Sequence, residues 1–164
     1  MINNLKKKTK SSLGFSLIEL LVVVAILGIL SAVGVTTYGG YIASTEKKAT
    51  KNLLQQISLA QTEEYSNSGA FFTQDTGSCS PTAATTQEIE QDLLGRGNYT
   101  LEAGDPSQTA KDTGYEICIG ELGGSNNFEI RAMQTNGEGG VKPIAQSCII
   151  TLNRTGISAE NDNC

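Results

Sequence analysis

A single apolar run near the start of the chain limits what the chain can fold into. Glu19 is the only ionisable residue among the 21 residues at positions 15–35. As an α-helix this run would be about 31 Å long, which matches the hydrocarbon core of a bilayer. The sequence therefore predicts one membrane-spanning helix.

The charges that precede this run predict its orientation. Residues 1–14 contain no acidic residue, and positively charged segments stay on the cytoplasmic side of a membrane. The rest of the chain should therefore lie outside the cytoplasm. The basic residues of this segment are Lys6, Lys7, Lys8 and Lys10.

Glu19 is unusual because an unpaired charge near the middle of a bilayer costs about 2.5 kcal/mol or more. Its carboxylate must therefore lie at a shallow depth, carry a proton or have a partner of opposite charge.

The leader and the start of the apolar run form a specific pattern. A short basic leader ends at Gly14, Phe15 follows, and Glu19 is the fifth residue after Gly14. This pattern resembles the class III signal of type IV prepilins and pseudopilins. The resemblance implies that a prepilin peptidase cuts between Gly14 and Phe15, that the new amino group of Phe15 is N-methylated, and that the apolar run is kept. The alternative is an ordinary secretory signal, cut after the run near Ser31-Ala32-Val33.

The resemblance also suggests a partner for Glu19. In a bundle of identical helices, the carboxylate of Glu19 can neutralise the amino terminus of Phe15 on a neighbouring subunit, because each buried charge is costly alone and tolerable when paired. Such a pair would fix the axial register of the helices. Alternatively, Glu19 reaches the headgroup region because the helix tilts.

A long helix is expected to continue past the apolar run. Apolar residues recur every three to four positions as far as Ala60, and Asn67-Ser68-Gly69 supplies a stop. We expect a membrane or filament-core helix at 15–37 and an amphipathic half at 38–67, after a leader at 1–14. Glycines interrupt this helix, either for close packing against a neighbour or to soften it so that it can unwind during assembly. They are Gly28, Gly34, Gly39 and Gly40.

The remainder predicts a small α+β domain. An αβ-loop at 68–97 contains a two-turn helix, for which Thr85 and Glu88 form a capping box. Residues 98–164 predict an antiparallel meander of about four strands, at 99–102, 115–119, 128–133 and 148–152, because alternating apolar residues are separated by glycine-rich turns. One face of this sheet should pack on the long helix. The helix residues expected there are Leu53, Leu54, Ile57 and Ala60.

The four cysteines all follow the apolar run, and no histidine is present. Disulfides in an oxidising compartment are therefore expected in place of a zinc site. Four cysteines allow three connectivities, between which the sequence does not decide. We favour Cys79 with Cys118 and Cys148 with Cys164, because the second pair closes a C-terminal loop of the kind that pilins have.

The residues give no pattern for catalysis, a metal or a cofactor. Without histidine there is no Ser-His-Asp arrangement, and no phosphate-binding loop is present. Acidic pairs on the expected helices are interpreted as solvated faces, and four further acidic residues are too scattered for a calcium loop. The first group is Glu63, Glu64, Glu88, Glu90 and Asp92; the second is Asp105, Asp112, Glu116 and Glu121.

The charge balance argues against a nucleic-acid partner. Removal of residues 1–14 would change the formal net charge from −5 to −9, because four lysines leave with them. Lys47, Lys48 and Lys51 form a basic cluster after the apolar run, for which lipid headgroups or acidic groups of neighbouring subunits are the expected partners. DNA uptake through these lysines stays an alternative.

The sequence is therefore interpreted as the structural subunit of a type IV pilus. As a precursor it would cross the inner membrane once with its N-terminus in the cytoplasm, and it would then become part of an extracellular filament. The expected partners are further copies of the chain, a prepilin peptidase, an assembly platform and minor pilins. The alternatives are a pseudopilin of a type II secretion system and a membrane-anchored binding domain that does not polymerise.

Overall fold

The structure is a computed structural model that describes residues 14–96, 106–124, 126–136, 141–156 and 158–164. The chain divides into two compact units, Met1–Ile42 and Ala43–Cys164, which are treated separately below. The expected leader, apart from Gly14, and the strand expected at 99–102 lie outside the described residues.

One helix, α1 (Leu17–Ser68), contributes to both units. It ends where expected, because Gly69 has a positive φ of 78° that side-chain-bearing residues rarely adopt, and the Gly69 N–H donates to the carbonyl of Tyr65 at 2.9 Å. Residues 53–57 of α1 lie in the second unit, where their apolar side chains are almost fully buried.

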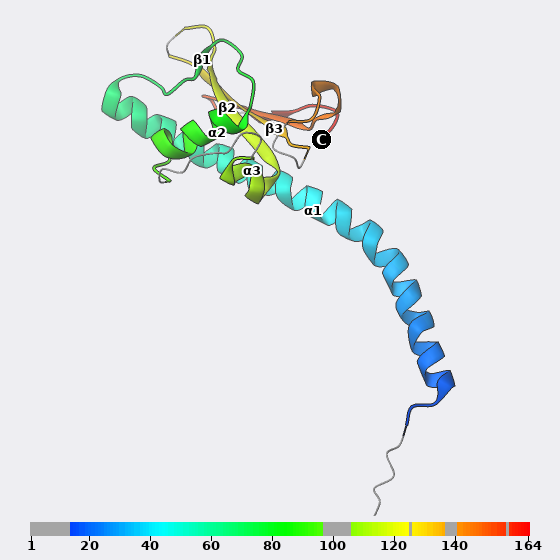
Figure 1. The fold of residues 1–164 in the computed structure, drawn as a ribbon. Helices are drawn as coiled ribbons and strands as arrows, with labels where there is room; N and C mark the ends of the chain where they lie inside the picture. Colours follow the sequence, from blue (N-terminus) through cyan, green and yellow to red (C-terminus); the bar gives the residue numbers. More distant parts are fainter. Residues whose placement is uncertain (1–13, 97–105, 125, 137–140, 157) are drawn as a thin grey trace, which may run out of the picture. The chain divides into compact units, whose positions relative to one another are not determined.

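The second unit contains a five-stranded sheet in the order β1-β2-β3-β4-β5 (Figure 1). The strands β2 (Tyr115–Glu121), β3 (Phe128–Gln134), β4 (Ile149–Asn153) and β5 (Ser158–Glu160) form an antiparallel meander, and β1 (Asp75–Thr76) pairs parallel with β2. The α+β fold class is confirmed. The count of about four strands is too low, because the two short outer strands were not expected.

The core lies between the sheet and α1. Leu53, Leu54 and Ile57 of α1 pack in one cluster with the inward residues of the sheet. Ala60, expected in this interface, is only half-buried, whereas Gln61 is fully buried. Gln61 exchanges hydrogen bonds of 2.8 Å and 2.6 Å with the backbone N–H and carbonyl of Phe72, so its polar atoms are satisfied. The sheet residues of the cluster are Tyr115, Ile117, Ile119, Phe128, Ile130, Ala132, Ile150 and Leu152.

Short helices connect α1 to the sheet. They are α2 (Ala83–Glu88), the π-helical turn η1 (Ile89–Leu93) and α3 (Gln108–Thr113), and a 3₁₀ turn η2 (Ile144–Gln146) precedes β4. The capping box expected at Thr85 and Glu88 is wrong by three positions. Thr82 is the N-cap, its side chain accepts from the Thr85 N–H at 3.2 Å, and the Thr85 hydroxyl accepts from the Thr82 N–H at 2.9 Å.

The part of the β2 edge that β1 does not pair with is covered by side chains of the loop and of α2. The hydroxyl of Thr86 accepts from the Ile117 N–H at 2.7 Å and donates to the Ile117 carbonyl at 3.0 Å. The side-chain oxygen of Gln74 accepts from the Ile119 N–H at 3.1 Å. Because these groups occupy the positions of a neighbouring strand, this part of the edge is not open to another chain.

Candidate assembly site

The first turn of α1 places Glu19 over the N-terminus of the helix. The Ser16 carbonyl accepts the first helical hydrogen bond from the Leu20 N–H at 3.3 Å. The Ser16 N–H, which has no partner of its own within a helix, donates to Oε2 of Glu19 at 3.0 Å. The Glu19 side chain is exposed and points back toward the start of the helix. Its negative charge is favourable there, because the N-terminus is the positive end of the helix dipole.

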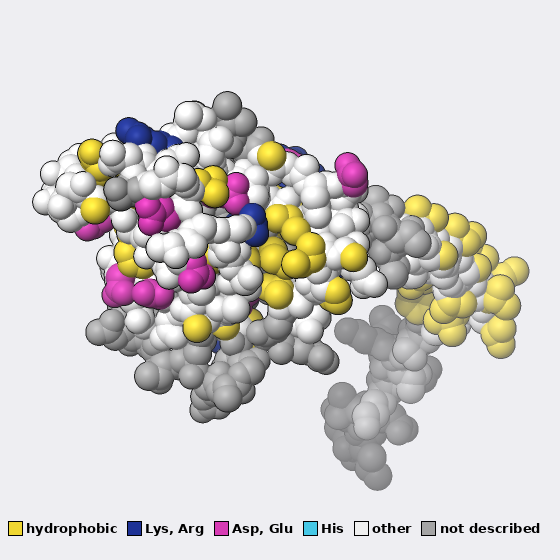
Figure 2. Space-filling model, turned by 90° about the horizontal axis from the view of Figure 1, so that it is seen from above, with side chains coloured by type: hydrophobic (Ala, Val, Ile, Leu, Met, Phe, Trp, Pro, Cys, Tyr) yellow, Lys and Arg dark blue, Asp and Glu magenta, His cyan; other side chains and the backbone are white. Residues whose placement is uncertain are grey.

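The apolar side chains that follow are solvent-exposed in the isolated chain. Hydrophobic side chains cover the N-terminal segment in Figure 2, and the exposed fraction is 89% at Phe15 and 49% even at Val22, the lowest among the large side chains of 15–33. An apolar surface of this extent requires lipid or another protein to cover it. Helix α1 contains a window with a mean hydropathy of 2.7, which is enough to cross a membrane.

Glu19 is one wall of a shallow apolar cavity of about 380 Å³. The other lining residues are Phe15, Ile18, Val22 and Val23. A small cation entering this cavity would meet a carboxylate beside apolar side chains. Once another molecule covers these side chains and excludes water, an ion pair there is stronger than in bulk solvent.

The four glycines of α1 are not required by contacts within the chain. At Gly28, Gly34, Gly39 and Gly40 an added Cβ would meet no atom within 4 Å, and the helix continues through all four. Contacts within the chain therefore do not exclude a side chain there, and close packing against another helix or softening of the helix stay predictions for these glycines.

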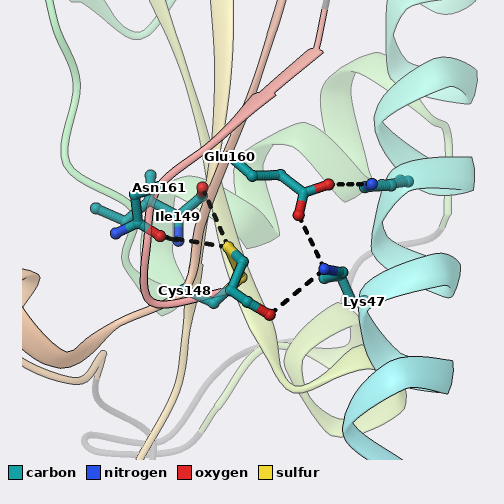
Figure 3. Close-up of polar contacts among 7 residues, drawn as sticks. Lys47, Cys148, Ile149, Glu160 and Asn161 are labelled. Carbon is teal, nitrogen blue, oxygen red and sulfur yellow. Dashed lines mark hydrogen bonds and ion pairs between the residues drawn. A yellow bond between two sulfur atoms is a disulfide. The ribbon is translucent and has the colours of Figure 1, made fainter.

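The second candidate region is the C-terminal loop. Disulfides join Cys148 to Cys164 and Cys79 to Cys118, the connectivity that we favour from the sequence. Glu160 forms ion pairs with Lys51 and, at 2.9 Å, with Lys47, whose ammonium group also donates to the carbonyl of Cys164 at 3.4 Å (Figure 3). The loop is thus attached to α1 by ion pairs and, by a covalent bond, to Cys148, the residue that precedes β4.

This ion-pair cluster gives two of the basic residues after the apolar run a partner that the sequence did not predict. Lys47 and Lys51 contact Glu160 of their own chain, and lipid or a neighbouring subunit stays a prediction for this cluster. Two of the three lysines considered for DNA binding are thereby already paired. Lys48 is exposed.

We expect the stability of the second unit to depend on Glu160 at neutral pH. Hydrogen bonds from Lys47 and Lys51 lower the pKa of Glu160, so the folded state gains stability above the unfolded-state pKa of about 4.3 and loses it as the pH falls through the lower folded-state pKa. Because the cluster is partly exposed, Glu160→Gln should cost about 0.5–1 kcal/mol at pH 7.

The measurement is urea unfolding of parent and Glu160→Gln chains between pH 7 and pH 2. The difference in free energy of unfolding should shrink below about pH 4 and in high salt. Glu63→Gln, at an exposed position of α1, is the control and should show no difference. A Glu160→Gln difference that is unchanged at pH 2 would contradict the ion-pair explanation.

For one of the acidic residues expected on solvated faces, Glu90, the prediction is wrong. Glu63, Glu88 and Asp92 are exposed and Glu64 is half-buried, but only 1% of Glu90 is exposed. Among the described residues, no group of three or more cysteine, aspartate or glutamate side chains could hold a metal ion.

Comparisons with known proteins single out the N-terminal region. The family model described as the prokaryotic N-terminal methylation motif matches residues 9–35. Over 58 residues the chain is 40% identical to fimbrial protein EcpC of Eikenella corrodens, covering 35% of this chain and 38% of that protein. Over 77 residues it is 39% identical to a fimbrial protein of Neisseria meningitidis serogroup B, covering 47% of this chain and 44% of that protein. The chain thus matches less than half of the length of each relative, and no solved structure matches it.

Proposed function

We propose that the chain is the structural subunit of a type IV pilus, because its methylation motif, its fimbrial relatives and its α+β fold support a type IV pilin. The leader is cut after Gly14, Phe15 is N-methylated, and the chain polymerises through the N-terminal part of α1. The observation that carries this proposal is an apolar helix, exposed along 15–33, whose one charge lies at its start.

Polymerisation explains both properties of this helix. Packed against other copies, its apolar surface leaves water, which is favourable by about 25 cal/mol for each Å² buried. Cleavage creates a cationic amine at Phe15, and the cavity beside Glu19 can receive the amine of a neighbouring copy. The single hydrogen bond from Ser16 leaves the carboxylate further acceptor capacity, since its two oxygens offer about four lone-pair sites.

The exposed apolar surface of this helix also accounts for the location of the precursor before assembly. We propose that the precursor crosses the inner membrane once, with residues 1–14 in the cytoplasm and the second unit outside. The two disulfides of the second unit fit this placement, because disulfides form and persist outside the reducing cytoplasm. The prepilin peptidase, the assembly platform and the minor pilins are the partners that this route needs.

A type II secretion pseudopilin would share the whole N-terminal site, and the fimbrial names of the two relatives favour the pilus subunit. The proposal assigns the chain no catalytic role of its own; it is the substrate of the peptidase.

Mass spectrometry of the unreduced chain from sheared surface filaments tests the proposal. We expect a chain that begins at Phe15, is heavier by one methyl group and lacks the four hydrogen atoms removed by two disulfides. Gly14→Val is the control and should retain the leader and stay in the membrane fraction. A chain that keeps Met1 or begins near Val33, or that is absent from the sheared fraction, would overturn the proposal.

A further inference from the structure

Two glutamates of the second unit are buried without an ion pair. The exposed fraction is 1% for Glu90, in η1, and zero for Glu116, in β2. None of the ion pairs within the described part of the chain involves either residue. A buried carboxylate without a counter-charge is costly, so both residues require an explanation.

One oxygen of each carboxylate is held by the same short helix. The Ser107 N–H donates to Oε1 of Glu116 at 3.0 Å, and the Thr109 N–H donates to Oε1 of Glu90 at 2.6 Å. Ser107 is the N-cap of α3, and backbone atoms two residues apart lie within about 7 Å of each other. Both carboxylates therefore bond to the start of α3, although 26 positions of sequence separate them.

The second oxygen of each carboxylate has no partner. Oε2 of Glu90 and Oε2 of Glu116 are both buried, and within the described part of the chain neither has a hydrogen bond. Buried polar atoms in proteins are almost always satisfied, and an orphaned one points to a group such as an ion or a water that completes the site. Here each orphaned oxygen belongs to a carboxylate whose other oxygen accepts a hydrogen bond from the start of α3.

We propose that a divalent cation of the oxygen-ligated class, Ca²⁺ or Mg²⁺, binds between Oε2 of Glu90 and Oε2 of Glu116. Such ions use one or two carboxylates and complete their coordination with water or carbonyl oxygens. The cation supplies the counter-charge that the protein lacks, while the N–H groups of α3 fix the other oxygen of each carboxylate. It thereby ties η1, α3 and β2 together, and the second unit gains stability wherever the ion is available.

The experiment uses the full chain, purified in detergent, and measures the thermal midpoint of unfolding. In the parent, 1 mM CaCl₂ or MgCl₂ should raise the midpoint by about 4 °C relative to excess EDTA, because an ion that binds only the folded state stabilises it. Glu90→Gln and Glu116→Gln retain an acceptor for α3 but remove one charge, and they should lose this rise. Asp92→Asn changes an exposed carboxylate of the same π-helical turn and should keep it.

Native mass spectrometry of the parent gives a readout that does not depend on the variants folding. A mass increase of one Ca²⁺ or Mg²⁺ for each chain, removed by EDTA, is the expected result. The same midpoint in EDTA and in either salt, together with a metal-free mass, would overturn the proposal. A midpoint rise that both glutamine variants retain would overturn it as well, because the ion would then bind elsewhere. These outcomes do not depend on whether the chain forms pili.

Discussion

Replacing Glu19 with glutamine is expected to abolish filament assembly while leaving leader cleavage intact. The side chain keeps its length and can still accept a hydrogen bond from the Ser16 N–H, so the start of α1 should be preserved. The carboxylate charge is lost, however, and the amine of Phe15 on a neighbouring subunit would enter an apolar helix bundle unpaired. A buried charge left without its partner costs about 3–5 kcal/mol.

This cost recurs at every subunit of a polymer, so its effect on assembly should be close to complete. The measurement is the amount of subunit in sheared filaments relative to the amount in the membrane, together with the N-terminal mass of the membrane pool. We expect no Glu19→Gln subunit in filaments and a processed, methylated chain in the membrane. Ser31→Ala is the control, because the Ser31 hydroxyl donates to the Leu27 carbonyl of its own helix. Normal filaments from Glu19→Gln would show that Glu19 does not pair with Phe15.

The elements that the sequence predicted correctly are those with a long periodic pattern. The apolar run and the three- to four-residue spacing that follows it correspond to α1, and the alternation at 115–119 and 128–133 corresponds to β2 and β3. A long pattern reports which face of an element is buried, and this face decides the fold class.

The missed elements are short and are held by contacts distant in sequence. Two-residue β1 and three-residue β5 are too short for a periodicity. The six-residue α3 did carry a local signal, since Ser107 is an N-cap residue and Gly114, with a φ of 75°, is a helix stop. A search for paired start and stop residues would have found α3.

The polar partners were the least predictable part. Lys47 and Lys51 meet a glutamate more than a hundred residues away. Glu90 and Glu116 both bond to the start of α3, which lies between them in the chain. An acidic residue in a polar stretch looks solvated until the tertiary fold places other elements over it.

Loss of either disulfide is expected to destabilise the second unit strongly. Cys79 and Cys118 are 39 residues apart, and Cys148 and Cys164 are 16 apart. Restriction of the unfolded chain over loops of these lengths corresponds to about 4 and about 3 kcal/mol respectively. A small domain is stable by only about 5–15 kcal/mol, so either loss removes a large part of the total.

The structural effect of losing a bridge should also differ between the two, because they hold different parts of the sheet. Cys79 and Cys118 are both buried, and the loop before Cys79 lies so close to β2 that a Cβ on Gly120 would overlap the carbonyl oxygen of Gly77. Breaking this bridge should release that loop and expose β2. Cys164 is exposed, and its loop keeps the ion pairs of Glu160 when the bridge is lost.

Urea unfolding of Cys79→Ala/Cys118→Ala and Cys148→Ala/Cys164→Ala chains measures both effects. We expect the first variant to lose more stability than the second. Adding Glu160→Gln should cost more in the second variant than in the parent, since the ion pairs are then the main attachment of the loop to α1. Equal unfolding midpoints for the parent and both double variants would show that the bridges do not form in the folded chain. A Glu160→Gln effect unchanged by loss of the Cys148–Cys164 bridge would show that the ion pairs and the bridge act independently.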